Sequence, residues 1–301
     1  MTDNSVKTEY SVALGFFDGL HRAHFSVLES ALINARRTGL TPAVLLFDEH
    51  PRTALTGEAV PALLTREERD ERLIKMGFTL LFISFKEIMN MAPAEFVSKI
   101  LCEKYPAGAL SCGYNYNFGK NAAGNTGILG ELCKERGIAL SVCPEFTLDG
   151  QTVSSTEIRR ALENGDVETA NKMLGYPFGF TARVFTGDRR GRLLGAPTIN
   201  QYIPEELITP KFGVYASRVY FDGREFVGVT NIGARPTFGE GSVRSETYIV
   251  DFSGDLYGRE VRVEIYSFIR GEKRFPDADT LKAQIEADVE SAKKYFGGEA
   301  L

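Results

Sequence analysis

Strand-like and helix-like segments alternate from about residue 10 to residue 176, and this alternation restricts the fold more than any other feature of the chain. Short apolar runs that predict strands lie at 12–14, 43–47, 80–84, 109–111 and 139–142. The spacing of apolar residues between them predicts helices at 25–37, 66–76, 94–104 and 128–136. Strand–helix alternation of this kind predicts an α/β fold, a doubly wound, Rossmann-like parallel sheet with helices on both faces.

The pattern changes in the second half of the chain. Strand-like segments follow one another at 218–221, 225–230, 246–252 and 260–269, and Asp222-Gly223 is a hairpin turn signal. Apolar and polar residues alternate along 261–266, so one face of that strand is buried and the other is wet. An apolar stripe from Leu281 to Phe296 predicts one closing helix. We therefore expect two domains, 1–177 and 178–301, the second an antiparallel β-barrel with a C-terminal helix.

Composition limits the partners and the compartment. The chain has 301 residues and a net charge of -5, which argues against a nucleic-acid surface. It contains no apolar run of transmembrane length and no leader pattern, so we expect no membrane contact and a cytoplasmic location. The four cysteines are far apart and are expected to be reduced core thiols. We expect a monomer or a weak homo-oligomer that holds anionic ligands through local groups.

Two of the three histidines, His21 and His24, lie three residues apart where a glycine turn leads into a helix. That spacing places both imidazoles on one helix face, beside the unpaired N–H groups of the helix N-terminus. His50 ends the next predicted strand, and ligands of open α/β sheets bind at such strand ends. A histidine pair of this kind is more often a solvated helix face, but the glycine turn and His50 favour a phosphate site.

The stretch from Gly15 to His24 reads G-F-F-D-G-L-H-R-A-H, and it resembles the G-x-F-D-G-x-H-x-G-H signature of the bacterial bifunctional riboflavin kinase/FAD synthetases. The resemblance implies an FMN adenylyltransferase domain with a nucleotidyltransferase fold. In that domain His21 and His24 would be catalytic, stabilising charge on the α-phosphate and the departing pyrophosphate. The ATP-binding positions that it implies here are Gly15, Phe17, Asp18, Gly19, His21 and His24.

Two further motifs of the first half resemble the same family. Residues 113–124 resemble its G-x-N/D-F-x-F-G-x-x-A/R-x-G motif, which implies that Asn115 and Phe118 bind the flavin. The resemblance to the family places His50 on the flavin side as well. Residues 153–159 form a hydroxyl cluster that enters a helix, and Ser154 and Glu157 have capping-box spacing. This cluster resembles the I/V-S-S-T-x-I-R motif. The implied triphosphate-binding residues are Ser154, Ser155, Thr156 and Arg159.

The second half begins with a glycine-rich, basic loop followed by Pro197-Thr198-Ile199-Asn200. Thr198 and Asn200 lie two residues apart on an extended segment, so their oxygens point the same way and could hold Mg²⁺. The run resembles the riboflavin kinase signature G-x-x-x-G-R-x-L-G-x-P-T-x-N. The resemblance implies that Glu246 is the catalytic base. It assigns ATP binding to Gly187, Gly191, Arg192 and Gly195, and flavin binding to Gly213, Tyr215, Arg235 and Thr237.

These motifs together predict an enzyme that phosphorylates riboflavin to FMN and adenylylates FMN to FAD, using ATP with Mg²⁺ at two sites. Departures from the family's pattern leave a second interpretation open. Ala23 stands where the family has Gly, and Leu46 and Glu49 depart from its T-F-x-P-H-P motif. In that second interpretation the chain is a riboflavin kinase whose first half is degenerate or regulatory. A flavin-sensing or RNA-contacting protein without turnover is a third.

Overall fold

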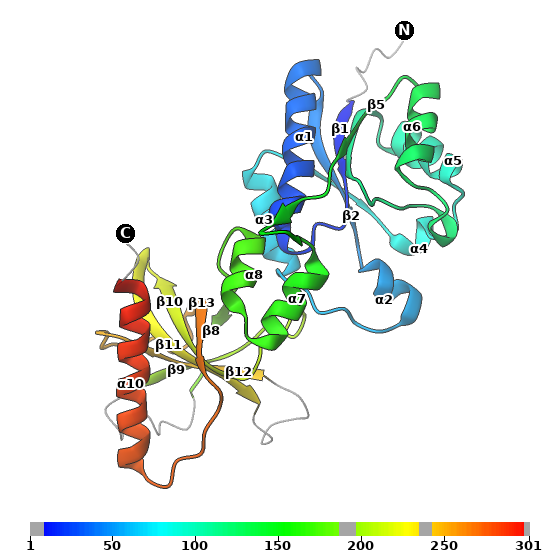
Figure 1. Ribbon diagram of the computed structural model, residues 1–301. Helices are drawn as coiled ribbons and strands as arrows, with labels where there is room; N and C mark the ends of the chain where they lie inside the picture. The colour runs from blue at the N-terminus through cyan, green and yellow to red at the C-terminus, as the bar shows by residue number, and fades with distance from the viewer. Residues whose placement is uncertain (1–8, 187–196, 235–242, 298–301) are drawn as a thin grey trace. The chain divides into compact units, whose positions relative to one another are not determined.

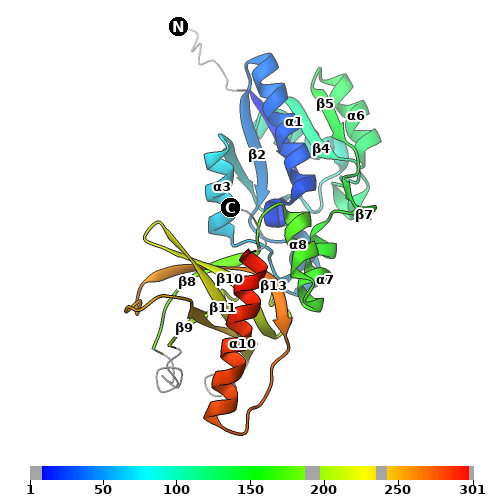
Figure 2. The same ribbon diagram turned by 60° about the vertical axis from the view of Figure 1, so that its left-hand side comes forward.

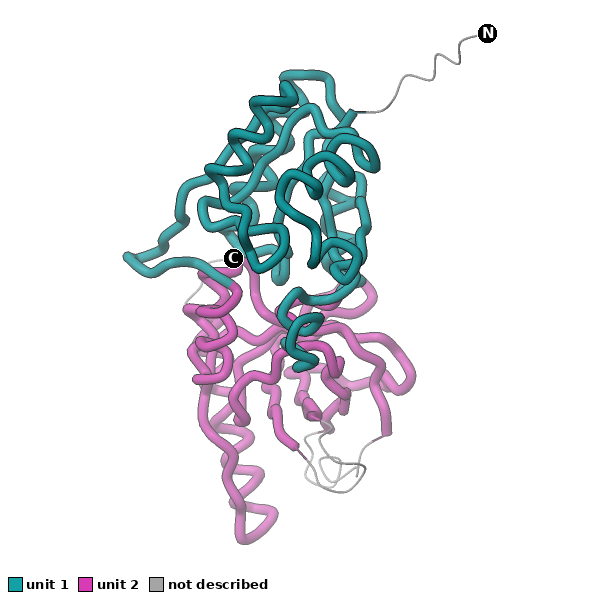
Figure 3. The backbone as a smooth tube through the Cα atoms, turned by 90° about the vertical axis from the view of Figure 1, so that its right-hand side faces the viewer, with its two compact units in different colours: residues 1–60, 66–154 teal, residues 61–65, 155–301 magenta. Residues whose placement is uncertain are grey.

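The computed structural model describes residues 9–186, 197–234 and 243–297. The chain divides into two compact units (Figure 3). The first unit comprises Met1–Val60 and Arg66–Ser154, and the second comprises Pro61–Thr65 and Ser155–Leu301. Each unit has its own sheet, and the two are described separately below.

The first unit contains the predicted parallel sheet, with strand order β3-β2-β1-β4-β5. Every neighbouring pair is parallel. The strands are β1 (Tyr10–Leu14), β2 (Thr41–Phe47), β3 (Thr79–Ile83), β4 (Ala107–Gly113) and β5 (Ala139–Cys143). The strand order reverses at β1, which has β2 on one side and β4 on the other. This topology confirms the doubly wound fold and places the switch point, where such sheets bind ligands, at the end of β1.

Helices cover both faces of this sheet (Figure 1). On one face, Ser11 of β1 donates from Oγ to the carbonyl of Ala31 in α1 at 2.8 Å. The opposite face, with Val12 and Leu14, packs in one apolar cluster with residues of η2 and α6. The helical segments are η1 (Asp18–Leu20), α1 (Arg22–Thr38), α2 (Pro51–Thr56), α3 (Arg66–Lys75), α4 (Phe85–Ile88), α5 (Pro93–Glu95), the π-helical η2 (Phe96–Lys104), η3 (Lys120–Ala122) and α6 (Thr126–Glu135). A two-stranded hairpin, β6 (Thr147–Leu148) and β7 (Gln151–Thr152), follows.

The second unit contains a six-stranded antiparallel sheet, with strand order β8-β13-β10-β11-β12-β9. The strands are β8 (Gly179–Arg183), β9 (Thr198–Tyr202), β10 (Gly213–Phe221), β11 (Arg224–Ala234), β12 (Val243–Ile249) and β13 (Glu260–Arg270). Its two edges approach each other, because Phe185 pairs with Asn200 and Gln201 donates to the carbonyl of Ala182 at 2.7 Å. The result is a nearly closed barrel, as the sequence predicted.

The two faces of the barrel strands have different surroundings. Ser217, Thr230 and Thr247 lie in the barrel interior, fully buried, and their hydroxyls form a chain with distances of 2.7 and 2.9 Å. On the outer face, α10 (Ala278–Gly297) packs Ala292 and Phe296 against β10 and β11 (Figure 2). The predicted closing helix is therefore present, and it covers one part of the outer face.

Two short helices, α7 (Ser155–Asn164) and α8 (Val167–Leu174), belong to the second unit. Asn171 of α8 donates to the carbonyl of Ile265 in β13 at 2.9 Å and accepts from the N–H of Phe178 at 2.8 Å. Ala62 likewise pairs with the segment before β10, through bonds of 2.6 Å to the Glu206 carbonyl and 2.8 Å from the Ile208 N–H. The border between compact units thus follows Ser154, whereas a functional boundary near residue 177 stays a prediction.

Candidate active sites

The turn that leads from β1 into α1 has an unusual backbone. Phe17 has φ 56° and Leu20 has φ 40°, left-handed values that side chains other than glycine adopt at a cost of about 1–2 kcal/mol. Gly19, with φ 76°, meets the same requirement without this cost. Phe17 and Leu20 are almost completely buried, so packing stabilises this shape. Strained turns held in this way cluster at ligand-binding sites.

His21 and His24 lie on the first turn of α1 with their rings stacked, 3.6 Å apart between centroids and 14° apart in plane. His21 is the N-cap of the helix, and its Nδ1 accepts a hydrogen bond from the His24 N–H at 3.3 Å. Because Nδ1 accepts, the proton of a neutral His21 is on Nε2. His21 therefore has one ring nitrogen fixed by the helix and a second that is a donor.

The electrostatics of His24 favour the neutral imidazole. Burial, and then the neighbouring His21, lower the pKa of His24 well below its usual 6.5. Its Nδ1 is buried without a hydrogen-bond partner in the described part of the chain. An anion beside this ring would favour the charged form. The pair is therefore suited to a ligand that brings negative charge, such as a polyphosphate.

His50 lies at the end of β2, beside the same turn. Its ring packs edge-on against Phe16, with centroids 4.4 Å apart, and its Nδ1 caps α2 by accepting from the Arg52 N–H at 3.1 Å. The adjacent Glu49 forms an ion pair with Lys86 at 3.1 Å. The structure thus brings His50 to the β1 turn, and it gives Glu49 a cationic partner that the sequence did not reveal.

The predicted flavin-side motif follows β4. Asn115 is exposed, and its backbone carbonyl accepts from Asn117 Nδ2 at 2.8 Å. Phe118 is only 7% exposed and packs in the core against Phe96, with ring centroids 5.5 Å apart. A Cβ at Gly124 would lie 2.6 Å from the Phe118 ring, which explains the glycine. Asn115 faces solvent, whereas Phe118 has a structural role whether or not a flavin binds.

The hydroxyl cluster stands at the start of α7, which begins at Ser155 directly after Ser154. Thr156 is exposed, and Arg159 Nε donates to the carbonyl of Pro61 at 2.7 Å. This bond orients the guanidinium from the 61–65 segment, a contact that the motif alone did not indicate. Ser154 belongs to the first unit, and Ser155, Thr156 and Arg159 belong to the second.

The barrel brings the predicted base and the predicted metal ligands together. Glu246 of β12 pairs directly with Asn200 of β9, and Thr198 pairs with Tyr248 two residues along. Directly opposite residues of antiparallel strands point to the same face, about 4.5–5.5 Å apart at Cβ. Asn231 of β11 is the next neighbour of Glu246 in this row. A carboxylate, an amide and a hydroxyl on one face are hard oxygen ligands that suit Mg²⁺.

Two residues predicted to bind the flavin in the second unit, Gly213 and Tyr215, are packed within the fold. Tyr215 is fully buried, its hydroxyl donates to the Lys211 carbonyl, and burial raises the pKa of its phenol. A Cβ at Gly213 would lie 2.4 Å from the carbonyl oxygen of Arg270, so only glycine fits there. Six predicted residues lie outside the described part of the chain: Gly187, Gly191, Arg192, Gly195, Arg235 and Thr237.

Sequence reasoning missed one cluster beside Glu246. Arg244 pairs with Tyr202, two residues along from the Glu246–Asn200 pair, and its guanidinium lies over the rings of Tyr202 and Phe185. Arg244 lies two residues before Glu246, and Tyr202 lies two residues after Asn200. This two-residue spacing in the sequence indicates that each residue shares a face of its strand with the predicted site residue.

A doubly wound sheet with histidines at its switch point, followed by a barrel with a carboxylate beside amide and hydroxyl oxygens, defines a two-part phosphate-transferring enzyme. Residues 3–157 match the FAD synthetase family, and residues 174–296 match the riboflavin kinase family. The chain belongs to the bifunctional riboflavin kinase/FMN adenylyltransferase family.

Curated relatives cover almost the full length of the chain. The bifunctional riboflavin kinase/FMN adenylyltransferase of Listeria monocytogenes is 33% identical over 98% of this chain and 95% of its own. The protein of the same name from Haemophilus influenzae is 36% identical, over 97% and 96%. A crystal structure of a Streptococcus pneumoniae protein, described as a macrolide-efflux protein, has a TM-score of 0.85 at 29% identity and covers 95% of both chains. Among the described residues, none of the helices has the length and apolar character needed to cross a membrane.

Proposed function

We propose that this chain phosphorylates riboflavin to FMN and adenylylates FMN to FAD, each with ATP. The observation that carries the proposal is the pairing of Glu246 with Asn200 on one face of the barrel. The same test decides both activities: purified protein is incubated with riboflavin and Mg-ATP, and FMN and FAD are resolved by chromatography. If neither FMN nor FAD forms from riboflavin, the kinase assignment fails.

For the kinase reaction, Glu246 accepts the proton of the ribityl 5′-hydroxyl as its oxygen attacks the γ-phosphorus, and ADP leaves. Thr198 and Asn200 would hold Mg²⁺, which would neutralise charge on the phosphate oxygens. The oxygen donors that share the outer face with Glu246 fit this ion. ATP would be bound by the 187–195 glycines and Arg192, and the flavin by Gly213, Tyr215, Arg235 and Thr237.

For the adenylyl transfer, the FMN phosphate attacks the α-phosphorus of ATP, and pyrophosphate leaves. His21 would donate from Nε2 to a phosphate oxygen, and His24 would take up a proton when the polyphosphate binds. Because FMN itself supplies the nucleophile, positioning and charge stabilisation are sufficient for catalysis. Ser154, Ser155, Thr156 and Arg159 would hold the triphosphate, and His50, Asn115 and Phe118 would lie on the flavin side.

The second interpretation, a kinase with a degenerate first half, is supported by Ala23 in the first turn of α1. A second argument for a degenerate first half is that Glu49 would repel ATP. The ion pair with Lys86 weakens this argument, because it balances the charge of Glu49 locally. Incubation of FMN with Mg-ATP separates the two: FAD formation supports the bifunctional enzyme, and its absence from an active kinase supports the second interpretation.

Finer parts of the proposal concern the setting of the enzyme. The residues proposed to bind ATP at the two sites are local groups and do not form an extended basic surface. This supports small-molecule partners and argues against a nucleic-acid partner. ATP as substrate and free thiols at all four cysteines support a cytoplasmic location. We further propose that the protein is a monomer or a weak homo-oligomer. The boundary between its two functional domains is proposed to lie near residue 177.

A further inference from the structure

The outer face of the barrel carries a compact cluster of Phe185, Tyr202 and Arg244 next to the Glu246 row. The two rings stack 4.3 Å apart with planes at 15°. The guanidinium carbon of Arg244 lies 4.9 Å from the centre of the Tyr202 ring and 5.3 Å from that of Phe185. Arg244 Nη2 donates to the Tyr202 hydroxyl at 3.0 Å. These contacts fix the guanidinium in one place.

Arg244 is more deeply buried than its role in packing requires. It is 9% exposed, and its Nε is buried without a hydrogen-bond partner in the described part of the chain. A buried donor without an acceptor is unfavourable, and for a charged group the penalty is larger. A methionine or leucine would contact the same rings without this penalty. The arrangement therefore suits an arginine that receives an acceptor from a ligand.

The position of this charge identifies the kind of ligand. Arg244 and Tyr202 pair two residues along from Glu246 and Asn200, so all four side chains are on the same face. The guanidinium contacts Tyr202 of β9, the strand of the predicted metal ligands. Phe185, over which it lies, donates from its N–H to the carbonyl of Asn200 at 2.9 Å. The positive charge thus stands beside the Glu246–Asn200 pair, on the opposite side of it from Thr198.

We propose that Arg244 binds the polyphosphate of ATP in the kinase site. This inference rests on the proposed kinase function. Phosphoryl transfer needs positive charge near the γ-phosphate besides the metal ion, and guanidinium groups bind phosphate oxygens in a directed way. The Phe185 and Tyr202 rings hold the guanidinium before ATP arrives, so little rotamer freedom is lost on binding.

The experiment compares three variants of the full-length protein. Arg244→Met keeps the bulk and removes the charge, Arg244→Lys keeps the charge, and Arg224→Met is the matched control. Arg224 also lies over an aromatic ring, that of Phe226 at 4.7 Å, but it is exposed and lies at the start of β11. For each protein, the KM for ATP and the kcat of riboflavin phosphorylation are measured. The KM for riboflavin and the conversion of FMN to FAD are measured as internal controls of folding.

We expect Arg244→Met to lower kcat/KM for ATP in the kinase reaction by about 10- to 100-fold, the loss of one charged hydrogen bond. Arg244→Lys should recover only part of this loss, because an ammonium keeps the charge but loses the ring stacking and the directed hydrogen bonds of the guanidinium. Arg224→Met should stay within about twofold of wild type. The KM for riboflavin and FAD formation should not change. If Arg244→Met disturbs folding, Arg244→Gln is used as the second neutral variant.

Two results would overturn the inference. In one, a folded neutral variant keeps kcat/KM for ATP within twofold of wild type. In the other, a neutral variant raises the KM for riboflavin or slows FAD formation as much as it lowers kcat/KM for ATP, which would mean that Arg244 has only a structural role. Failure of the proposed function itself is distinguishable, because then the wild-type protein would not form FMN at all.

Discussion

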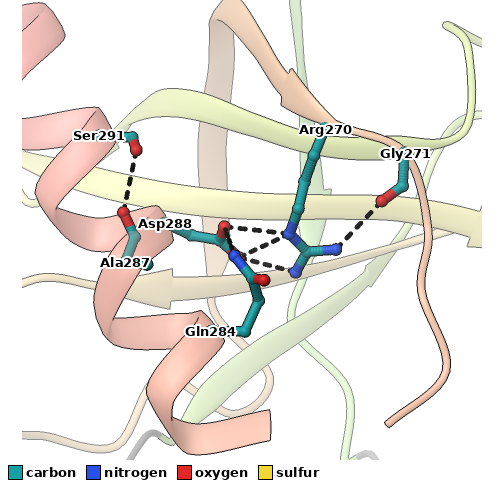
Figure 4. A network of polar contacts seen from close by, with 6 residues as sticks. All are labelled: Arg270, Gly271, Gln284, Ala287, Asp288 and Ser291. Carbon is teal, nitrogen blue, oxygen red and sulfur yellow. Dashed lines mark hydrogen bonds and ion pairs between the residues drawn. The ribbon is translucent and has the colours of Figure 1, made fainter. Parts of the chain in front are cut away.

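Asp288 is the centre of a buried polar network that joins α10 to the barrel (Figure 4). Arg270, the last residue of β13, donates from Nε to the two carboxylate oxygens at 3.0 and 3.1 Å. Its Nη2 donates to Oδ2 at 2.7 Å, and Gln284 donates to Oδ1 at 2.9 Å. Asp288 is 2% exposed, so the carboxylate depends on these donors. The network therefore links the C-terminal helix to the strand that precedes it.

Substitution Asp288→Asn should destabilise the second unit strongly. Removal of one partner from a buried ion pair costs about 3–5 kcal/mol, because the other charge is left without compensation. The Arg270 side chain is 15% exposed, so water recovers part of that loss. We expect the free energy of unfolding to fall by about 2–4 kcal/mol. This is a large share of the stability of an ordinary domain.

Hydrogen exchange measured by mass spectrometry on peptides from 278–297, together with urea unfolding, reports this change. Glu290→Gln is the matched control on the same helix. Its ion pair with Lys293 spans 3.8 Å between exposed side chains, and its removal should cost about 0.5 kcal/mol or less. The two substitutions each remove one negative charge from α10, so their difference isolates the effect of burial.

A double substitution tests whether Arg270 and Asp288 stabilise the fold as a pair. With Arg270→Leu and Asp288→Leu together no charge remains at this contact, and the stability should return to within about 1–2 kcal/mol of wild type. If Asp288→Asn costs no more than Glu290→Gln, burial of the Arg270–Asp288 pair does not raise the cost of breaking it. If the double variant loses as much unfolding free energy as Arg270→Leu and Asp288→Leu lose in sum, the two residues are not coupled.

Three further predictions concern the active sites. Glu246→Gln should reduce riboflavin phosphorylation by about 10²–10⁴-fold in a rate assay, because the amide cannot accept a proton, while FMN-to-FAD conversion stays near wild type. Because the pKa of His24 is lowered in the folded state, only the unfolded state takes up a proton at this residue as pH falls below 6.5. The first unit should therefore lose stability below that pH. In urea unfolding followed across that pH range, His24→Gln should reduce this loss, and an unchanged pH dependence would contradict the lowered pKa. Ala23→Gly should lower the KM for ATP in FAD formation or leave it unchanged, and His24→Ala should nearly stop that reaction; a rise in KM for the glycine variant would contradict the steric argument.

The order of strands and helices was predictable because it depends on local periodicity. The alternation in the first half gave the parallel sheet, and the period of two along 261–266 matches β13, where Val261, Val263 and Ile265 are buried. The sequence did not indicate that α7 and α8 pack with the second unit. That packing depends on Asn171 reaching the carbonyl of Ile265, a contact between segments far apart in the chain.

The candidate kinase site was predictable in its residue types but not in its geometry. Thr198 and Asn200 share a face because they lie two residues apart on one strand, and this follows from local structure. Their proximity to Glu246 depends on the register between β9 and β12, which no local pattern determines. The same register places Arg244 beside Tyr202. The two-residue spacing indicates only that Arg244 and Glu246 share a face, and the contact with Tyr202 could not be predicted from it.

Glu49 shows how such long-range contacts change a functional argument. Considered alone, its carboxylate next to His50 would repel a triphosphate and favour a degenerate first half. Lys86, distant in sequence, lies 3.1 Å from it, and the pair adds no net charge beside the β1 turn. Repulsion of ATP by Glu49 would weaken as salt screens it, whereas an obstruction by the Ala23 methyl group does not depend on salt. Because the charge is paired, any weakness in ATP binding at this site should arise from Ala23, and the KM for ATP in FAD formation should not fall as salt is added.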